Sequence, residues 1–168
     1  MKGWTFSKTN KMRIYKPTDE NPELSYGDTT VFLAGSIEMG VAEDWQTRLT
    51  ESLKDLDVVL FNPRRDSWDS SWEQRESNPE FNHQVNWEMN MLDRADFIFM
   101  YFSPDTKSPI SLLELGLYAD GRNMIVCCPD GFWRKGNVEI VCSRYNIPLY
   151  NDFDAAVASL ISKIKKYQ

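Results

Sequence analysis

Five runs of mainly apolar residues recur along the chain, and polar or amphipathic segments separate them. They cover residues 29–35, 57–63, 95–103, 123–129 and 147–150. The run ADFIFMYFS, residues 95–103, is almost continuously apolar, which is typical of a central strand covered on both faces. We therefore interpret the five runs as buried strands of one sheet.

Between the strands, apolar residues follow a helical spacing. Trp45, Leu49 and Leu53 recur every fourth residue and predict a helix that begins near Ala42. Further helices are expected within residues 81–94, 111–121, 130–146 and 152–167. Strands that alternate with helices become parallel neighbours, because each helix returns the chain to the same edge of the sheet. The pattern predicts an α/β fold: a single doubly wound domain with a mostly parallel five-stranded sheet flanked by helices, flavodoxin-like or Rossmann-like.

The first 28 residues differ from the rest of the chain, because they are polar and follow no clear period. We expect residues 1–28 to form an N-terminal arm with a short hairpin, and residues 29–168 to form the α/β domain. A chain of 168 residues is long enough to bury the core of one domain, and its length gives no reason to expect two.

Composition narrows the possible partners. The net charge of −6 argues against long nucleic acid, whose binding needs a basic face. The three cysteines, Cys127, Cys128 and Cys142, lie in or near apolar segments, so we interpret them as reduced core residues of a cytoplasmic protein. With His83 as the only histidine we expect no metal and no cofactor. No apolar run approaches the ~18 residues of a membrane span, so no membrane partner is expected.

Ligands of open parallel sheets bind beyond the carboxyl ends of the strands. This rule selects four segments: residues 35–38, 62–65, 103–109 and the residues after Pro129. Gly35 and Ser36 belong to LAGSIEMG, which lacks the pattern of a dinucleotide or P-loop motif. A glycine lets a ligand approach the backbone closely, although an ordinary turn explains it equally well. Asn62 and Arg64 are candidate ligand contacts in the second segment.

Two glutamates are predicted to converge at this edge. Glu114 lies between Leu113 and Leu115 at the start of a helix, where the helix dipole favours a negative charge. Glu88 lies on the preceding helix, eight residues before Asp96, which places it about 12 Å above the start of the central strand. Asp96 starts that strand and is expected at the opposite edge. For both glutamates, the alternative interpretation is a solvated acid on a helix surface.

Four sequences at these positions carry a resemblance to a known family. VFLAGSIEMG, NPRR, QVNWEMNMLDRADFIFMYF and SPISLLELGLYA together resemble the nucleoside 2-deoxyribosyltransferase superfamily. They look most similar to its deoxyribosyltransferase-like branch, in a superfamily that also contains deoxynucleoside 5′-monophosphate N-glycosidases. The resemblance covers residues 30–140, and its most specific motif is the E-L-G helix.

The resemblance implies a role for several residues. Glu114 takes the position of the family's nucleophile, and Glu88 that of its second acid, usually aspartate. Phe32 takes a position that is often tyrosine, and Ser108 one where the transferases have aspartate and the monophosphate hydrolases can have serine. Asn137 matches an asparagine that often completes the site of a neighbouring subunit. Together with Gly35, Ser36, Asn62 and Arg64, these residues form the expected substrate-binding set.

The resemblance leaves the substrate class open. The monophosphate hydrolases have an arginine where this chain has Glu38, and an acid there repels a 5′-phosphate. Arg64 or Arg65 could compensate for that repulsion. Trp68 and Trp72, in the long polar loop 64–80, are candidates for stacking on a base, and ordinary packing is the alternative interpretation.

The resemblance implies an enzyme that cleaves the N-glycosidic bond of a nucleoside or its monophosphate through a covalent glycosyl–glutamate. A free nucleobase or water then accepts the sugar, and we expect a homo-oligomer. Two other hypotheses stand beside this one: a non-catalytic nucleotide-binding or sensor module on the same fold, and a hydrolase of NAD-type ribosyl compounds with the same nucleophile.

Overall fold

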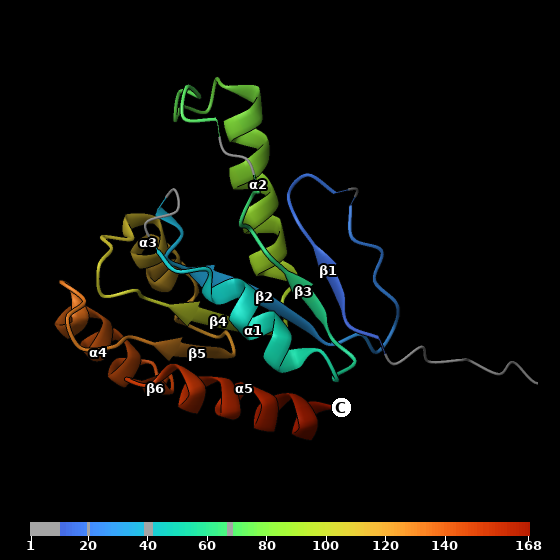
Figure 1. Cartoon of the computed structure of the whole chain (residues 1–168), viewed down its shortest axis with the longest axis vertical. Coiled ribbons are helices and arrows are strands. Elements are labelled where there is room, and N and C mark those ends of the chain that lie inside the picture. The colour runs from blue at the N-terminus through green and yellow to red at the C-terminus, as the bar shows by residue number, and fades with distance from the viewer. Residues whose placement is uncertain (1–10, 20, 39–41, 67–68) are drawn as a thin grey trace, which may run out of the picture.

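The computed structural model describes residues 11–19, 21–38, 42–66 and 69–168, and within them six strands form one parallel sheet (Figure 1). The strands are β1 (Arg13–Tyr15), β2 (Thr30–Gly35), β3 (Val59–Phe61), β4 (Phe97–Tyr101), β5 (Met124–Cys127) and β6 (Leu149–Tyr150). Their order across the sheet is β1-β3-β2-β4-β5-β6, and all neighbours are parallel. The predicted doubly wound α/β fold is therefore confirmed.

The expected count of five strands is wrong, because β1 adds a sixth. This strand lies inside the segment that was expected to be an arm, and it pairs in parallel with β3 instead of forming a hairpin. It has only three residues, and Ile14 at its centre is exposed. An edge strand of this kind is only partly covered, so it needs no continuous apolar run and leaves little signal in the sequence.

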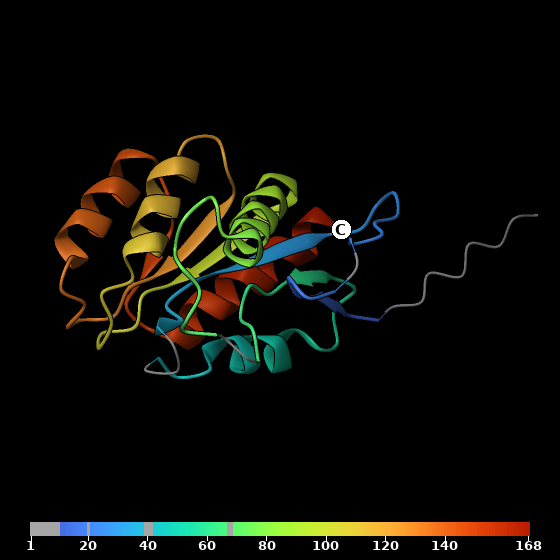
Figure 2. The same ribbon diagram turned by 90° about the horizontal axis from the view of Figure 1, so that it is seen from above.

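The described ranges contain five helices, of which four connect strands and the last, α5, follows β6. They are α1 (Trp45–Leu53), α2 (Pro79–Arg94), α3 (Pro109–Tyr118), α4 (Lys135–Arg144) and α5 (Phe153–Tyr167). Figure 2 shows α2, α3 and α4 on one face of the sheet and α1 and α5 on the other. Helix α1 begins at Trp45 instead of near Ala42, because the side chain of Asp44 caps it by accepting the backbone N–H of Thr47 at 3.2 Å.

Each face of the sheet has its own hydrophobic core. Under α2, α3 and α4 the buried side chains include Phe32 and Trp87, and under α1 and α5 they include Trp45 and Phe99. Strand β4 contributes to both clusters, which explains its continuous apolar sequence. All three cysteines are free and buried, as expected of core residues.

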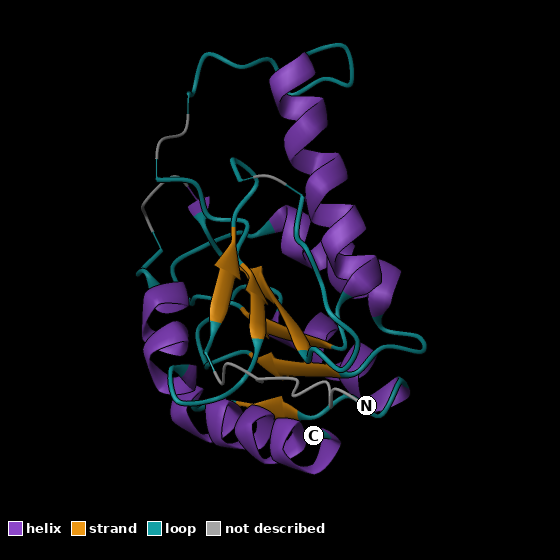
Figure 3. Cartoon of the chain, turned by 90° about the vertical axis from the view of Figure 1, so that its right-hand side faces the viewer, coloured by secondary structure: helices purple, strands orange, loops and turns teal. Residues whose placement is uncertain are grey.

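Strands β2 and β4 are neighbours in the sheet, but the chain does not pass directly from one to the other. From β2 the chain first moves outward to β3 and then crosses back to β4, β5 and β6. A crevice forms at such a reversal, beyond the carboxyl ends of the two strands, and ligands bind there in open α/β sheets. Figure 3 shows the start of α2 and the loop before it projecting beyond the tips of the strands on this side.

Candidate functional site

The loops that follow β2, β3 and β4 meet at the carboxyl edge of the sheet. Ser36 comes directly after β2, and its backbone N–H donates to the carbonyl of Tyr101, the last residue of β4, at 2.9 Å. The Oγ of Ser36 also accepts the backbone N–H of Ser103 at 2.8 Å. These bonds join the two loops at the point where the strand order reverses.

Gly35 makes this junction possible. Its backbone has φ 133°, and a Cβ at this position would lie 2.2 Å from the carbonyl oxygen of Tyr101. Only glycine fits such a close approach of two backbones without strain. The glycine is therefore explained by the close packing of β2 against β4.

Glu88 and Glu114 lie on the neighbouring helices α2 and α3, and both are half-buried. Burial raises the pKa of Glu114 to about 8, and the negative charge of Glu88 contributes to the same shift. Burial also raises the pKa of Glu88 to about 7, against the opposing effects of a hydrogen bond from Gln84 and the charge of Arg65. The two carboxyls therefore interact, and the pair tends to hold one proton near neutral pH.

Gln84 holds Glu88 from one helical turn earlier on α2. Its Nε2 donates to Glu88 Oε1 at 2.5 Å and to the carbonyl of Pro63 at 3.2 Å. Its Oε1 accepts from Nε of Arg65. Every polar atom of this buried amide thus has a partner, and the hydrogen bond to Glu88 has a fixed direction.

Arg65 and Arg64 point in different directions from the loop after β3. The guanidinium of Arg65 reaches α2 and lies 4.9 Å from the ring centroid of Trp72. Arg64 instead donates to Gln46 Oε1 at 3.1 Å, on the side of α1. Asn62 orders the same loop, because its Oδ1 accepts the backbone N–H of Arg64 at 3.0 Å. Of the two arginines, Arg65 is the one linked to the acid pair.

A cluster of hydroxyls closes the edge beside the start of α3. Ser36, Thr106 and Ser108 are buried, and their side-chain oxygens lie 2.6 to 2.9 Å from one another. Ser108 is the residue before α3, with φ 46°, in the left-handed region. Its hydroxyl contacts that of Ser36 in the loop after β2, and its contact with a substrate stays a prediction.

Phe32 and Asn137 differ in their exposure to solvent. Phe32 is fully buried in β2 and packs against Trp87, with ring centroids 6.4 Å apart. Asn137 is exposed in the first turn of α4. Trp68 lies outside the described residues, and Trp72 is half-buried under Arg65, a contact that suits packing.

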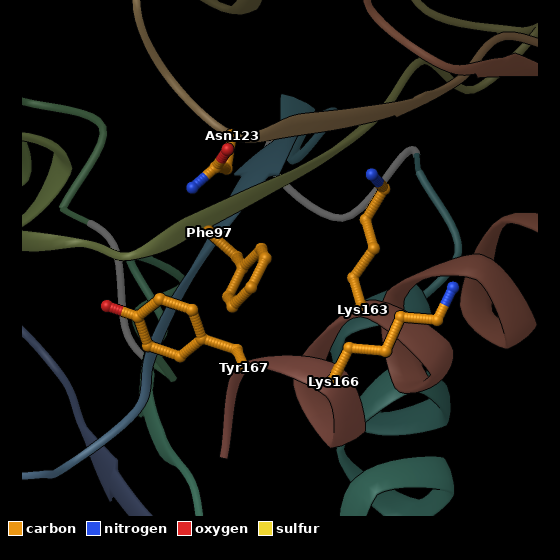
Figure 4. A pocket seen from close by; sticks show the side chains of 5 residues that line it. All are labelled: Phe97, Asn123, Lys163, Lys166 and Tyr167. Atoms are coloured by element: carbon orange, nitrogen blue, oxygen red, sulfur yellow. The ribbon is translucent and has the colours of Figure 1, made fainter.

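Asp96 lies at the opposite edge, as predicted. Its Oδ2 accepts both the backbone N–H and the hydroxyl of Thr30, at 2.8 and 2.9 Å. A shallow depression of about 230 Å³ lies near it, between Phe97, Asn123 and the end of α5 (Figure 4). A second depression, of about 470 Å³, lies on α4. Neither depression includes the acid pair.

The sequence predicts Glu88 and Glu114 at the site, but it gives no role to Gln84 and offers Arg65 only as a counter-charge for a phosphate, not as a partner of the acid pair. A glutamine at i−4 from Glu88 was the available signal for Gln84, because residues four apart on a helix are neighbours. In the described part of the chain, no group of three or more histidine, cysteine, aspartate or glutamate side chains is placed to hold a metal ion. The described helices are too short or too polar to span a lipid bilayer.

Comparison with known proteins gives one family. The family model described as nucleoside 2-deoxyribosyltransferase like matches residues 28–132, which include β2 to β5 and both glutamates. No curated protein matches the chain.

Proposed function

The chain belongs to the nucleoside 2-deoxyribosyltransferase-like family, and on that premise we propose that it cleaves the N-glycosidic bond of a nucleoside with Glu114 as nucleophile. One observation supports this assignment most. Two half-buried glutamates on adjacent helices each have a raised pKa, and the charge of Glu88 contributes to the raised pKa of Glu114. Paired acids of different roles are what glycosyl transfer with a covalent intermediate requires.

In the first step, a carboxylate oxygen of Glu114 attacks the anomeric carbon while the bond from that carbon to the base nitrogen breaks. The electron pair goes to the base, and Glu88 gives it a proton. Positive charge develops on the sugar in the transition state, and it stabilises Glu114 as the carboxylate. The proton shared by the pair therefore moves towards Glu88, where the leaving base needs it.

In the second step, an acceptor attacks the same carbon and releases Glu114. The acceptor is the nitrogen of a free nucleobase or the oxygen of water, and its proton passes to the carboxylate of Glu88. Hydrogen bonding from Gln84 stabilises that carboxylate between the two steps. The pair then returns to its starting charge.

The apolar surface of the helical layer supports a second part of the proposal, a homo-oligomer. Ile110, Leu113 and Leu117 follow one stripe of α3, and each is more than half exposed. Met89 on α2 and Ile140 on α4 are exposed in the same layer. A second copy of the chain would bury this surface and would place residues such as Asn137 at the site of its neighbour.

The test is separation of products after incubation with 2′-deoxynucleosides, with and without a free acceptor base. We expect base release or exchange by the wild type, and a loss of about 10³-fold or more in Glu114→Ala. Glu51→Ala, at an exposed position of α1 in the opposite helical layer, is the matched control. Full activity of the folded Glu114→Ala protein would refute the assignment. Binding that raises the melting temperature without turnover would favour a non-catalytic binding module.

A further inference from the structure

The side chain of Gln84 joins Arg65 to Glu88, and the two ends of its amide have different partners. Its Oε1 accepts from Nε of Arg65, whereas its Nε2 donates to Glu88 Oε1 and to the carbonyl of Pro63. A guanidinium can only donate, and a peptide carbonyl can only accept. These two neighbours therefore permit one orientation of the buried amide, the one in which its N–H groups point to Glu88.

Arg65 is itself held from a second side. Its guanidinium lies 4.9 Å from the ring centroid of Trp72, in the loop before α2. A cation is attracted to the face of an aromatic ring, and the planar guanidinium presents its N–H groups in fixed directions. The N–H that Gln84 accepts thus has a defined position, which is set by the loop after β3 and not by α2 alone.

One oxygen of Glu88 is reserved as an acceptor by this arrangement. A neutral carboxyl carries its proton on one oxygen, and the other oxygen is the better acceptor. Since Oε1 accepts the N–H of Gln84, the proton of neutral Glu88 belongs on Oε2. Among the described residues, Gln84 is the side chain that hydrogen-bonds this carboxyl, so Oε2 remains open to a substrate.

Two charged groups from other elements face Glu88. Glu114 on α3 is coupled to it, because each negative charge disfavours the other. Arg65, in the loop after β3, has the opposite effect. Burial raises the pKa of Glu88 to about 7, and both the hydrogen bond from Gln84 and the charge of Arg65 oppose that rise. The amide and the cation thus favour the same product of proton transfer, the carboxylate.

We propose that Arg65 is a positioning residue of the site, which orients the amide of Gln84 so that Glu88 holds its transferable proton on Oε2; this inference rests on the proposed function. That proton passes to the base nitrogen, which takes the electron pair of the broken N-glycosidic bond, and Glu88 is left as the carboxylate. Without Arg65, the amide of Gln84 can turn. Its oxygen then accepts the proton of neutral Glu88 and directs that proton away from the base.

The first measurement is the pH profile of base release from a 2′-deoxynucleoside by the wild type, Arg65→Met and Arg65→Lys. We expect Arg65→Met to lower kcat by about 10-fold or more with little change in KM. The alkaline limb should move up by about one pH unit, because neutral Glu88 keeps its proton longer. Arg65→Lys retains a donor and a charge, so it should recover part of kcat.

Arg48→Met is the matched control for this profile. Arg48 also lies over an aromatic ring, 4.4 Å from the ring centroid of Phe153, but it belongs to α1 on the opposite face of the sheet. We expect the control to keep the wild-type profile. An Arg65→Met profile identical to that of the wild type overturns the inference.

A titration without substrate separates this inference from the proposed chemistry. In Glu114→Gln, Glu88 no longer titrates as a pair with Glu114, and 13C NMR of the glutamate carboxyl carbons follows it, with Glu88→Gln to assign the signal. Adding Arg65→Met or Gln84→Leu should raise the titration midpoint by about one pH unit. The two changes together should raise it little more than either alone, because Arg65 acts through Gln84.

Non-additive shifts of this kind support the role of Arg65 even where the wild type releases no base, a result that would contradict the proposed function alone. Additive shifts would mean that Arg65 acts on Glu88 by its charge and not through the amide. Additive shifts, or an unmoved midpoint in Arg65→Met, overturn the inference whatever the activity.

Discussion

Glu114 is destabilised as a carboxylate by the position that would make it reactive. Burial and the charge of Glu88 both raise its pKa, and no opposing contribution comes from the described residues. The ionised carboxylate of such a nucleophile is poorly solvated before the substrate binds. The positive charge that develops on the sugar in the transition state then stabilises it. The same physics makes the residue visible in stability measurements.

Glu114→Gln should stabilise the protein increasingly as the pH rises. The folded-state pKa of about 8 lies above the ordinary value of 4.5, so the folded state holds the proton more tightly than the unfolded state does. The stability that this group contributes is fully present below pH 4.5 and is lost up to pH 8. The glutamine side chain of the variant does not titrate, so the variant does not lose this stability as the pH rises. Thermal melts between pH 5 and 9 should show a lead of the variant that grows with pH, by about 2–4 °C for each kcal/mol.

A lead that stays constant or shrinks with rising pH would contradict the raised pKa. Glu139→Gln, at an exposed position, should show no growing lead.

Gln84→Leu should move the alkaline limb of the activity profile to higher pH. The hydrogen bond from Gln84 stabilises the ionised form of Glu88, so its loss raises the pKa of Glu88 and the pair keeps its last proton longer. We expect a shift of about 1 pH unit in the kcat/KM profile. The control variant Gln74→Leu, in the exposed loop before α2, should leave the alkaline limb unchanged. An unshifted limb in Gln84→Leu would show that Gln84 does not control the ionisation of Glu88.

At the scale of elements, the close contact between β2 and β4 joins the loops that carry the candidate site. Gly35→Ala would place a Cβ 2.2 Å from the backbone of Tyr101 and would strain a backbone with φ 133°. We expect a loss of about 3 kcal/mol or more in the free energy of unfolding, measured by urea denaturation. Gly136→Ala, where an added Cβ meets nothing within 4 Å, is the control and should change stability by less than about 1 kcal/mol. Equal losses of unfolding free energy in the two variants would show that the close contact of Gly35 with Tyr101 does not determine the effect.

Most elements could be predicted from the sequence because their apolar patterns are strong. Strand β4 contributes to both cores and reads as a continuous apolar run. Helix α3 was expected to begin at residue 111, yet it begins at Pro109, since proline suits the first helical turn. Strand β1 could not be predicted, because its three residues are too few to show an alternating pattern and its pairing with β3 depends on tertiary structure.

At the scale of the whole molecule, the layer of α2, α3 and α4 exposes apolar side chains that one chain does not cover. Leu117→Glu places a charge in this surface at the end of α3, and we expect the oligomer to dissociate in light scattering at micromolar concentration. The side chain is exposed in the single chain, so the variant should still fold. Lys163→Glu, on the opposite face, is the control and should keep the assembly. A wild-type protein of single-chain mass would contradict the proposal.

The position of the site also follows from whole-molecule topology. The strand order directs loops after β2 and β4 to one edge, so the convergence of Glu88 and Glu114 could be expected from sequence. The contact of Glu38 with α3 and the chain from Arg65 through Gln84 to Glu88 could not. They depend on loop conformations, including two left-handed residues, that no periodic pattern encodes.

Trapping of the glycosyl-enzyme tests the central claim most directly. A nucleoside with fluorine at the 2′ position disfavours an oxocarbenium-like transition state and slows the second step. Intact-protein mass spectrometry should then show one added fluorosugar per chain, and peptide mapping should place it on Glu114, with no adduct in Glu114→Gln. An adduct on another residue, or base release without any adduct from wild type, would contradict Glu114 as the nucleophile.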